Sequence, residues 1–307
     1  MNPTKRHIEG SFQDLSQELR NFEEIARGII PRSGGTPSLA GIDICGRVLP
    51  LNGIAGGDHL IYIDFKRRYD LDARIKRAVE AGRPDIASNL ERCKRKAGIA
   101  LIDVAGHHGT DAMLAAMFHQ AFLTGALYEL DISGNITRRL FENLNQRFNR
   151  TSAVNKFITA LYGEISVDAT FRFLSAGHPL PAIFSAARDG FIEASPESAT
   201  AFPPLGTFPS RHIVDRNKVK SSVLGFKDRY EVNEWTLMGA GDILLLYSDG
   251  LLEHARGNES YFSLRLEQTI RGVKHLSATD IIGTIIEDLR TFADPIDDVS
   301  LVVLKKD

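Results

Sequence analysis

The chain has 307 residues, 43% of them hydrophobic and 25% charged, and its formal net charge is −2. This length suits one large domain or two small ones with a substantial core, and the charge favours neither a nucleic acid nor an anionic membrane as partner. No apolar run approaches the roughly 18 residues of a membrane span, and no apolar signal core follows the N-terminus. The two cysteines, Cys45 and Cys93, lack the spacing of a metal or redox site. We therefore expect a cytoplasmic protein with reduced thiols.

Residues 11–30 predict a helix with one apolar face. Its apolar side chains recur at three- and four-residue spacing, at Phe12, Leu15, Leu19, Phe22, Ile25 and Ile29. Pro31 ends the helix. Two interpretations stay open: the helix packs on the main domain, or it serves regulation or dimerisation. We therefore divide the chain into an N-terminal segment, 1–35, and a main domain, 36–307.

Two predicted strands, 39–49 and 59–65, flank the glycine-rich segment NGIAGGD at 52–58, which ends in a carboxylate. The next segment, 66–96, is a basic insert with eleven Lys or Arg residues against five acidic residues. It predicts two short helices in a hairpin. A solvated helical face is one interpretation of this charge, and a docking surface for an acidic or phosphorylated partner is the other.

The remaining elements alternate in groups. We expect strands at 99–104, 157–166, 170–174, 181–184, 243–247 and 299–304, helices at about 111–127, 134–149, 261–272 and 278–292, and irregular structure over 185–240. Strands in pairs with short links, and helices in groups between them, favour an α+β fold with antiparallel sheets over an alternating parallel fold.

Four acidic positions lie at predicted strand ends. Asp58 opens a strand after two glycines, Asp103 lies near the end of IALIDV, Asp249 follows LLLYS, and Asp297 with Asp298 precedes VSLVVL. An Asp-Gly pair after a strand is by itself an ordinary turn, but a strand-end charge is costly to bury unless it is paired or binds a cation. Four of them predict one cation site. Oxygen ligands without cysteine favour Mg²⁺ or Mn²⁺ over Zn²⁺, and such ions activate water and neutralise phosphate charge.

These carboxylates lie in segments that resemble the metal-dependent serine/threonine protein phosphatases, called PPM or type 2C, and above all their bacterial branch typified by the stage II sporulation protein E. The matching segments occur in the family's order and cover most of residues 38–305. They are IAGGD (54–58), LIDVAGH (101–107), FITALYGEIS (157–166), LSAGHPLPAIF (174–184), FPPLGT (202–207), GDILLLYSDGLLEHA (241–255) and DDVSLVVL (297–304). The resemblance implies a four-layer α-β-β-α sandwich of two antiparallel sheets flanked by helices.

The resemblance also implies two Mn²⁺ or Mg²⁺ ions whose bound water attacks phosphorus directly, without a phosphoenzyme. The implied protein ligands are Asp103 for both ions, Asp58 and the main-chain carbonyl of Val104 for one, and Asp249 with Asp297, or alternatively Asp298, for the other. His107 is a candidate general acid because it follows Asp103 closely in the sequence.

The leading hypothesis is therefore a phosphatase for phosphoserine and phosphothreonine on a regulatory protein. By resemblance, that protein would be an anti-sigma-factor antagonist in partner-switching signalling. An activator protein, or a second copy of the chain, would act through residues 11–30. Two alternatives stay open: a pseudo-phosphatase that binds a phosphoprotein without turnover, and a phosphatase for small phosphorylated metabolites. No nucleic-acid or membrane partner is expected.

Overall fold

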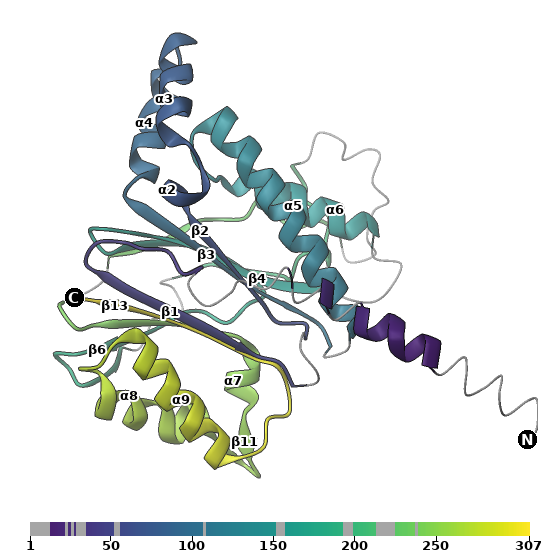
Figure 1. Cartoon of the computed structure of the whole chain (residues 1–307), viewed down its shortest axis with the longest axis vertical. Coiled ribbons are helices and arrows are strands. Elements are labelled where there is room, and N and C mark those ends of the chain that lie inside the picture. The colour runs from purple at the N-terminus through teal and green to yellow at the C-terminus, as the bar shows by residue number, and fades with distance from the viewer. Residues whose placement is uncertain are drawn as a thin grey trace, which may run out of the picture.

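The computed structural model describes most of the chain. The described residues are 13–21, 24–25, 28, 35–51, 56–106, 109–151, 157–192, 199–212, 225–236 and 239–307. Two sheets stack face to face within this part (Figure 1).

The first sheet contains both ends of the main domain. Its strands, in spatial order, are β1 (Ile42–Leu49), β13 (Val299–Lys306), β10 (Ile243–Tyr247), β6 (Ala182–Ser185) and β7 (Gly190–Ile192). Every pairing in it is antiparallel. The C-terminal strand therefore lies between the first strand of the domain and β10.

The second sheet carries the middle of the chain. Its spatial order is β2 (His59–Asp64), β3 (Lys96–Val104), β4 (Ile158–Ser166), β5 (Thr170–Ala176) and β8 (Ala201–Phe202), and β9 (Asn233–Thr236) also pairs with β5. All these pairings are antiparallel except that between β5 and β8. The expected antiparallel sheets are confirmed.

Both faces of the second sheet are covered, and the sequence of β2 shows why. Successive side chains of a strand point to opposite faces. Leu60 and Tyr62 lie in the core between the two sheets, whereas Ile61 and Ile63 face the helices. A strand buried on both faces has no polar alternation, which explains the nearly unbroken apolar run in HLIYIDF.

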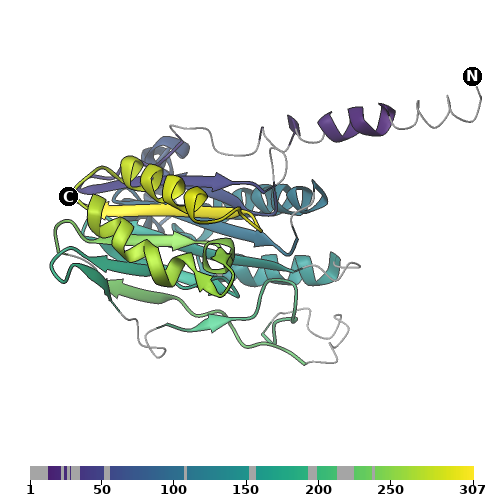
Figure 2. The same ribbon diagram turned by 90° about the horizontal axis from the view of Figure 1, so that it is seen from below.

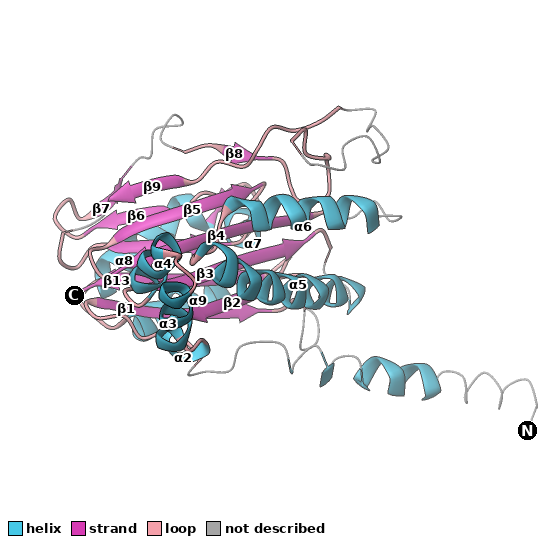
Figure 3. Cartoon of the chain, turned by 90° about the horizontal axis from the view of Figure 1, so that it is seen from above, coloured by secondary structure: helices cyan, strands magenta, loops and turns pink. Residues whose placement is uncertain are grey.

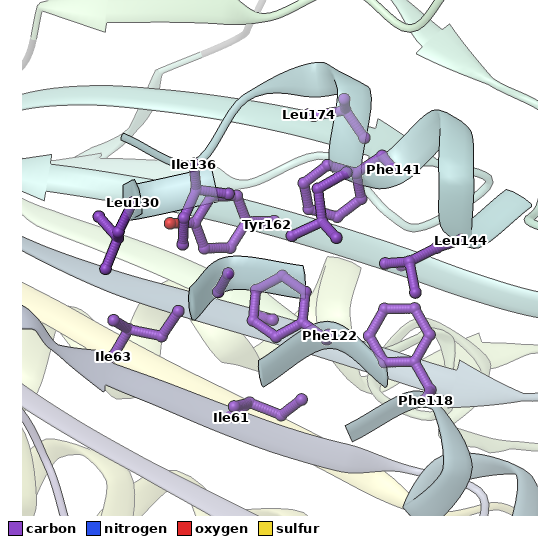
Figure 4. Close-up of a cluster of buried hydrophobic side chains, with 14 of the residues drawn as sticks. Ile61, Ile63, Phe118, Phe122, Leu130, Ile136, Phe141, Leu144, Tyr162 and Leu174 are labelled. Carbon is purple, nitrogen blue, oxygen red and sulfur yellow. The ribbon is translucent and has the colours of Figure 1, made fainter. Parts of the chain in front are cut away.

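Helices complete the outer layers. α5 (Gly109–Ser133) and α6 (Arg138–Thr151) cover the second sheet, and Figure 4 shows Phe118, Phe122 and Phe141 packed over β2 and β4. The first sheet is covered by the π-helical turn η3 (Phe262–Leu266), α8 (Glu267–Val273) and α9 (Ala278–Phe292). The expected four-layer α-β-β-α sandwich is confirmed.

The basic insert forms a helical hairpin, as predicted. A one-turn helix, α2 (Phe65–Arg68), leads into α3 (Leu71–Glu80) and α4 (Pro84–Cys93), which project beyond the sheet edge in Figure 1. Asp64 and Asp70 cap α2 and α3 through their carboxylates, and a proline opens α4. β3 begins at Lys96, earlier than predicted, because residues 96–98 continue the ladder with β4.

The N-terminal segment is described only in part. Residues 13–21 are helical and lie away from both sheets in Figures 2 and 3. Leu15 and Leu19, on the predicted apolar face, are 65% and 55% exposed. Whether this helix serves regulation or dimerisation stays a prediction. Across the described residues, no helix combines the length and apolarity needed to cross a membrane.

The irregular region between β7 and β10 is attached to α6 by a buried polar cluster. Glu142 of α6 accepts hydrogen bonds from Lys227 Nζ at 3.1 Å and from the main-chain N–H of Tyr230 at 2.7 Å, and also from Ser210 Oγ. Burial lowers the pKa of Lys227, although Glu142 opposes this effect. The cluster fixes a stretch of chain that has little regular secondary structure of its own.

Candidate functional site

The predicted acidic residues meet at one end of the sandwich. Asp58 directly precedes β2, and Asp103 lies near the end of β3. Because β2 and β3 are antiparallel and pair His59 with Ile102, the start of one strand lies beside the end of the other. In the other sheet, Asp249 follows the end of β10 and Asp298 precedes the start of β13. Because β10 and β13 pair in antiparallel fashion, these two positions also lie side by side.

The remaining members of the cluster flank these positions. Asp249 is the first residue of α7 (Asp249–Glu253), so the turn expected at Ser248-Asp249-Gly250 is the start of a short helix. Asp297 directly precedes Asp298 and is half-buried. Ser248 occupies the N-cap position of α7, although its side chain makes no capping hydrogen bond. A small hairpin follows the helix and consists of β11 (Ala255–Arg256) and β12 (Glu259–Ser260).

Burial and mutual repulsion raise the pKa values of these carboxyls. The pKa of Asp103 rises to about 7, mainly through burial and then through the charges of Asp249 and Asp297. Burial, followed by the charge of Asp103, raises the pKa of Asp58 well above its usual value. Burial also raises the pKa of Asp249, and the nearby negative charge of Glu253 raises it further. A divalent cation would offset this repulsion between carboxylates.

Ser248 ties the two sheets together at this site. Its hydroxyl donates to Asp58 Oδ2 at 2.7 Å and accepts from the main-chain N–H of Ser300 at 2.9 Å. Its own N–H donates to the carbonyl of Ser300 at 3.1 Å. The fully buried Ser248 therefore fixes Asp58 against β13.

Sequence reasoning missed both Ser248 and Glu253. Glu253 lies four residues after Asp249, a spacing that places two side chains on the same face of a helix. The sequence SDGLLE contains this spacing, but the two side chains share a face only because the segment is helical, as α7 shows. The role of Ser248 depends on a neighbour 190 residues away in sequence, which no local pattern indicates.

The adjacent residues Asp297 and Asp298 differ in their surroundings. Asp298 is only 3% exposed, and its two oxygens accept from the main-chain N–H groups of Leu51 at 2.6 Å and Gly57 at 2.7 Å. Asp297 uses Oδ1 for a local bond from the N–H of Asp298 at 2.8 Å. The carboxylate of Asp298 thus holds the β1–β2 connection, whereas Asp297 holds only its own turn.

Glycine is required at two close main-chain approaches beside the carboxylate cluster. A Cβ at Gly250 would lie 1.9 Å from the main-chain oxygen of Asp298, and a Cβ at Gly57 would lie 2.6 Å from that of Val104. Both neighbours are main-chain atoms, which move only with their strands. The glycines therefore set the close approach of these segments.

We expect Gly250→Ala to lower the free energy of unfolding by roughly 1–3 kcal/mol, because the methyl group overpacks against a fixed carbonyl. Gly283→Ala in α9 is the control, since a Cβ there meets nothing within 4 Å; it should raise stability by about 0.5–1 kcal/mol through helix propensity. Urea unfolding of both variants measures the difference. Equal stability of Gly250→Ala and the parent chain would contradict the close packing.

His107, the candidate general acid, lies outside the described residues. His178 is buried, and its Nδ1 lies 2.9 Å from Thr159 Oγ1. Burial lowers the pKa of His178 to about 3, so it stays neutral. These surroundings indicate a structural role, in which His178 stabilises its turn through hydrogen bonding.

The donor set fits a hard cation in its chemistry, because all the side chains are carboxylates. In the described part of the chain, however, no three Asp, Glu, His or Cys side chains are already arranged to bind an ion. Asp58 and Asp298 direct oxygens to Ser248 and to main-chain N–H groups instead. Binding an ion would therefore require the carboxylates of Asp103, Asp249 and Asp297 to turn toward a common point.

Comparison with known proteins identifies relatives of this arrangement. The sequence model of one family, described as Stage II sporulation protein E (SpoIIE), matches residues 94–307. This range includes Asp103, Asp249 and Asp297 but not Asp58. No curated protein matches the chain.

Several solved structures share the fold. The SiaA-PP2C domain of Pseudomonas aeruginosa is similar with a TM-score of 0.63 and 14% identity, over 97% of this chain and 98% of that one. The RsbU and RsbW domains of a Mycobacterium tuberculosis protein are similar with a TM-score of 0.59 and 18% identity, over 88% of this chain and 61% of that one. The PP2C phosphatase domain of SpoIIE from Bacillus subtilis, with a fragment of its regulatory domain, is similar with a TM-score of 0.58 and 19% identity, over 87% of this chain and 64% of that one. The chain thus spans less than two thirds of the latter two structures.

Proposed function

Because the chain belongs to the stage II sporulation protein E family of PP2C-type protein serine/threonine phosphatases, we propose that it hydrolyses phosphoserine and phosphothreonine esters in a protein substrate. The observation that carries the proposal is the carboxylate cluster at one end of the sandwich. In the described residues no Lys or Arg forms an ion pair with Asp58, Asp103 or Asp249. Such a cluster repels a phosphate dianion unless cations are bound, so it suits a metal-dependent reaction.

Asp103, Asp249 and Asp297 would hold two Mn²⁺ or Mg²⁺ ions, with Asp58 and the main-chain carbonyl of Val104 as further ligands. The ions would supply an activated water and neutralise phosphate charge. We assign the ligand role to Asp297 rather than to Asp298, because both oxygens of Asp298 already accept main-chain hydrogen bonds. Ser248 would position Asp58 by donating to one of its oxygens.

The proposed substrate is a phosphorylated regulatory protein in the cytoplasm, such as an anti-sigma-factor antagonist in partner-switching signalling. This part of the proposal is supported by family membership and by the likeness to domains named RsbU and SpoIIE. An activator protein or a second copy of the chain would act through residues 11–30. The exposed Leu15 and Leu19 support such a contact, because they leave apolar surface available.

Metal-dependent phosphate release tests the function. Chelator-stripped protein would be titrated with Mn²⁺ or Mg²⁺ in the presence of a phosphoserine protein, with a generic aryl phosphate for comparison. We expect release that requires the ion, favours the phosphoprotein and is lost in Asp249→Asn. Preference for small phosphates would favour a metabolite phosphatase. Ion binding to folded protein without any release would contradict the proposal and favour a pseudo-phosphatase.

A further inference from the structure

A cationic cavity lies at the opposite end of the second sheet from the carboxylate cluster. Lys96 begins β3 and Asp103 lies near its end, so the two ends are roughly 23 Å apart at about 3.3 Å per residue. The cavity has a volume of about 450 Å³ and lies where the end of α4 and the start of β3 meet the turn between β4 and β5. Its size falls in the range of small-molecule sites, roughly 300–1,000 Å³.

Four cationic side chains line this cavity: Arg92, Arg95, Lys96 and Arg172. Two of them have carboxylate partners. Lys96 Nζ lies 3.1 Å from Glu164, and Arg172 Nε lies 2.9 Å from Glu234.

The other two cations have no such partner. Within the described chain, neither Arg92 nor Arg95 forms an ion pair, and Arg92 donates only to the amide oxygen of Asn89. The nearby carboxylate of Asp168 accepts from Ser166 Oγ within its own turn. The hydrogen bond from Ser166 and, to a smaller extent, the charge of Arg95 lower the pKa of Asp168. Because Arg92 and Arg95 are exposed and neither is held in an ion pair by a described residue, their guanidinium groups can turn toward an anion in the cavity.

A smaller cavity of about 180 Å³ adjoins the first and shares Asn135 and Arg172 with it. About half of its wall is apolar and includes Ile136, Phe141 and Leu174, and the other half is polar and includes Thr137, Arg138 and Glu164. Figure 4 shows these three side chains gathered beside the ring of Tyr162. A polar cavity and a smaller cavity with one apolar wall thus meet at Arg172.

We propose that the two cavities form one binding site for a small aromatic compound that carries phosphate groups, the chemistry of a nucleotide. Planar guanidinium groups bind phosphate oxygens in pairs, so Arg92 and Arg95 would hold the phosphates. The aromatic ring would pack on the apolar wall of the smaller cavity, and Asn135 and Arg172 would hydrogen-bond it at the junction. The site uses none of the residues assigned to the metal ions.

Binding of ATP tests this site directly. Calorimetry in EDTA would compare ATP with adenosine and with pyrophosphate, which each fill one cavity only. Chelation keeps phosphate from the metal site, so the result does not depend on phosphatase activity. We expect ATP to bind at least tenfold more tightly than either smaller probe. The double substitution Arg92→Ala and Arg95→Ala should weaken ATP binding by at least tenfold.

A matched pair of substitutions separates the site from general attraction to the basic hairpin. Arg67→Ala with Arg77→Ala removes the same charge from the hairpin but lies outside both cavities, so ATP affinity should change less than twofold. Val232→Trp, which fills the smaller cavity, should weaken ATP binding but not pyrophosphate binding. Equal losses in the two arginine pairs, equal binding of ATP and pyrophosphate, or no ATP binding would each overturn the proposal.

Discussion

Asp103→Asn should abolish phosphatase activity and, in the metal-free protein, raise the melting temperature. Both effects have one cause. The carboxylate of Asp103 is buried among the charges of Asp249, Asp297 and Asp298, so its ionised form is unfavourable without a cation. The neutral amide removes that repulsion but is a poor ligand for a hard ion. Because metal ions contribute several kcal/mol to catalysis and each 1.36 kcal/mol is tenfold in rate, we expect at least about a 100-fold loss.

Thermal unfolding with and without Mn²⁺ separates the two effects. The metal-free variant should melt a few degrees higher than the parent chain, since roughly 1 kcal/mol shifts a domain of this size by about 2–4 °C. Added Mn²⁺ should stabilise the parent chain and leave the variant nearly unchanged. Asp85→Asn, on the exposed side of α4, is the control and should behave like the parent chain. Wild-type turnover in Asp103→Asn, or a lower melting temperature without metal, would contradict the proposed site.

Most of the architecture could be predicted from the sequence because its strands are long and apolar. β3, β4 and β10 are buried along nearly their whole length, and such runs between turn residues are a strong strand signal. The elements that were missed are short. β8 and β11 have two residues each and depend on partners that no local pattern reveals. α7 was predicted as a turn because Asp-Gly favours both a turn and, here, the start of a helix.

The candidate site was predictable only in its charged members. A carboxylate at a strand end is visible in the sequence, and the antiparallel order of the strands brings four such ends together. The hydrogen bond from Ser248 to Asp58 joins two different sheets, so it becomes visible only when the sandwich is assembled. The same is true of Asp298, whose partners Leu51 and Gly57 lie more than 200 residues earlier.

Asp298→Ala should destabilise the fold far more than Asp297→Ala. Its carboxylate is buried and accepts from three main-chain N–H groups, over short distances from Leu51 and Gly57 and at 3.4 Å from Asp58, so the two short bonds dominate. Each buried N–H left unpaired costs about 1–3 kcal/mol, so we expect a loss of roughly 2–6 kcal/mol. Removal of its negative charge also relieves repulsion with Asp103, which makes the net loss smaller than the hydrogen bonds alone imply. Asp297 is half-buried and holds only its own turn, so Asp297→Ala should cost less than about 1 kcal/mol.

Urea unfolding in EDTA and Mn²⁺ binding together distinguish an anchor from a ligand. Asp297→Ala should fold normally and lose most of its affinity for Mn²⁺, since its carboxylate is assigned to the ion. Asp298→Asn keeps one acceptor oxygen and the side-chain volume, so it should fold even if Asp298→Ala does not. We expect it to lose stability in EDTA, where ion binding plays no part. If Asp298→Asn is as stable as the parent chain but no longer binds Mn²⁺, Asp298 is the ligand and the assignment of these two residues is reversed.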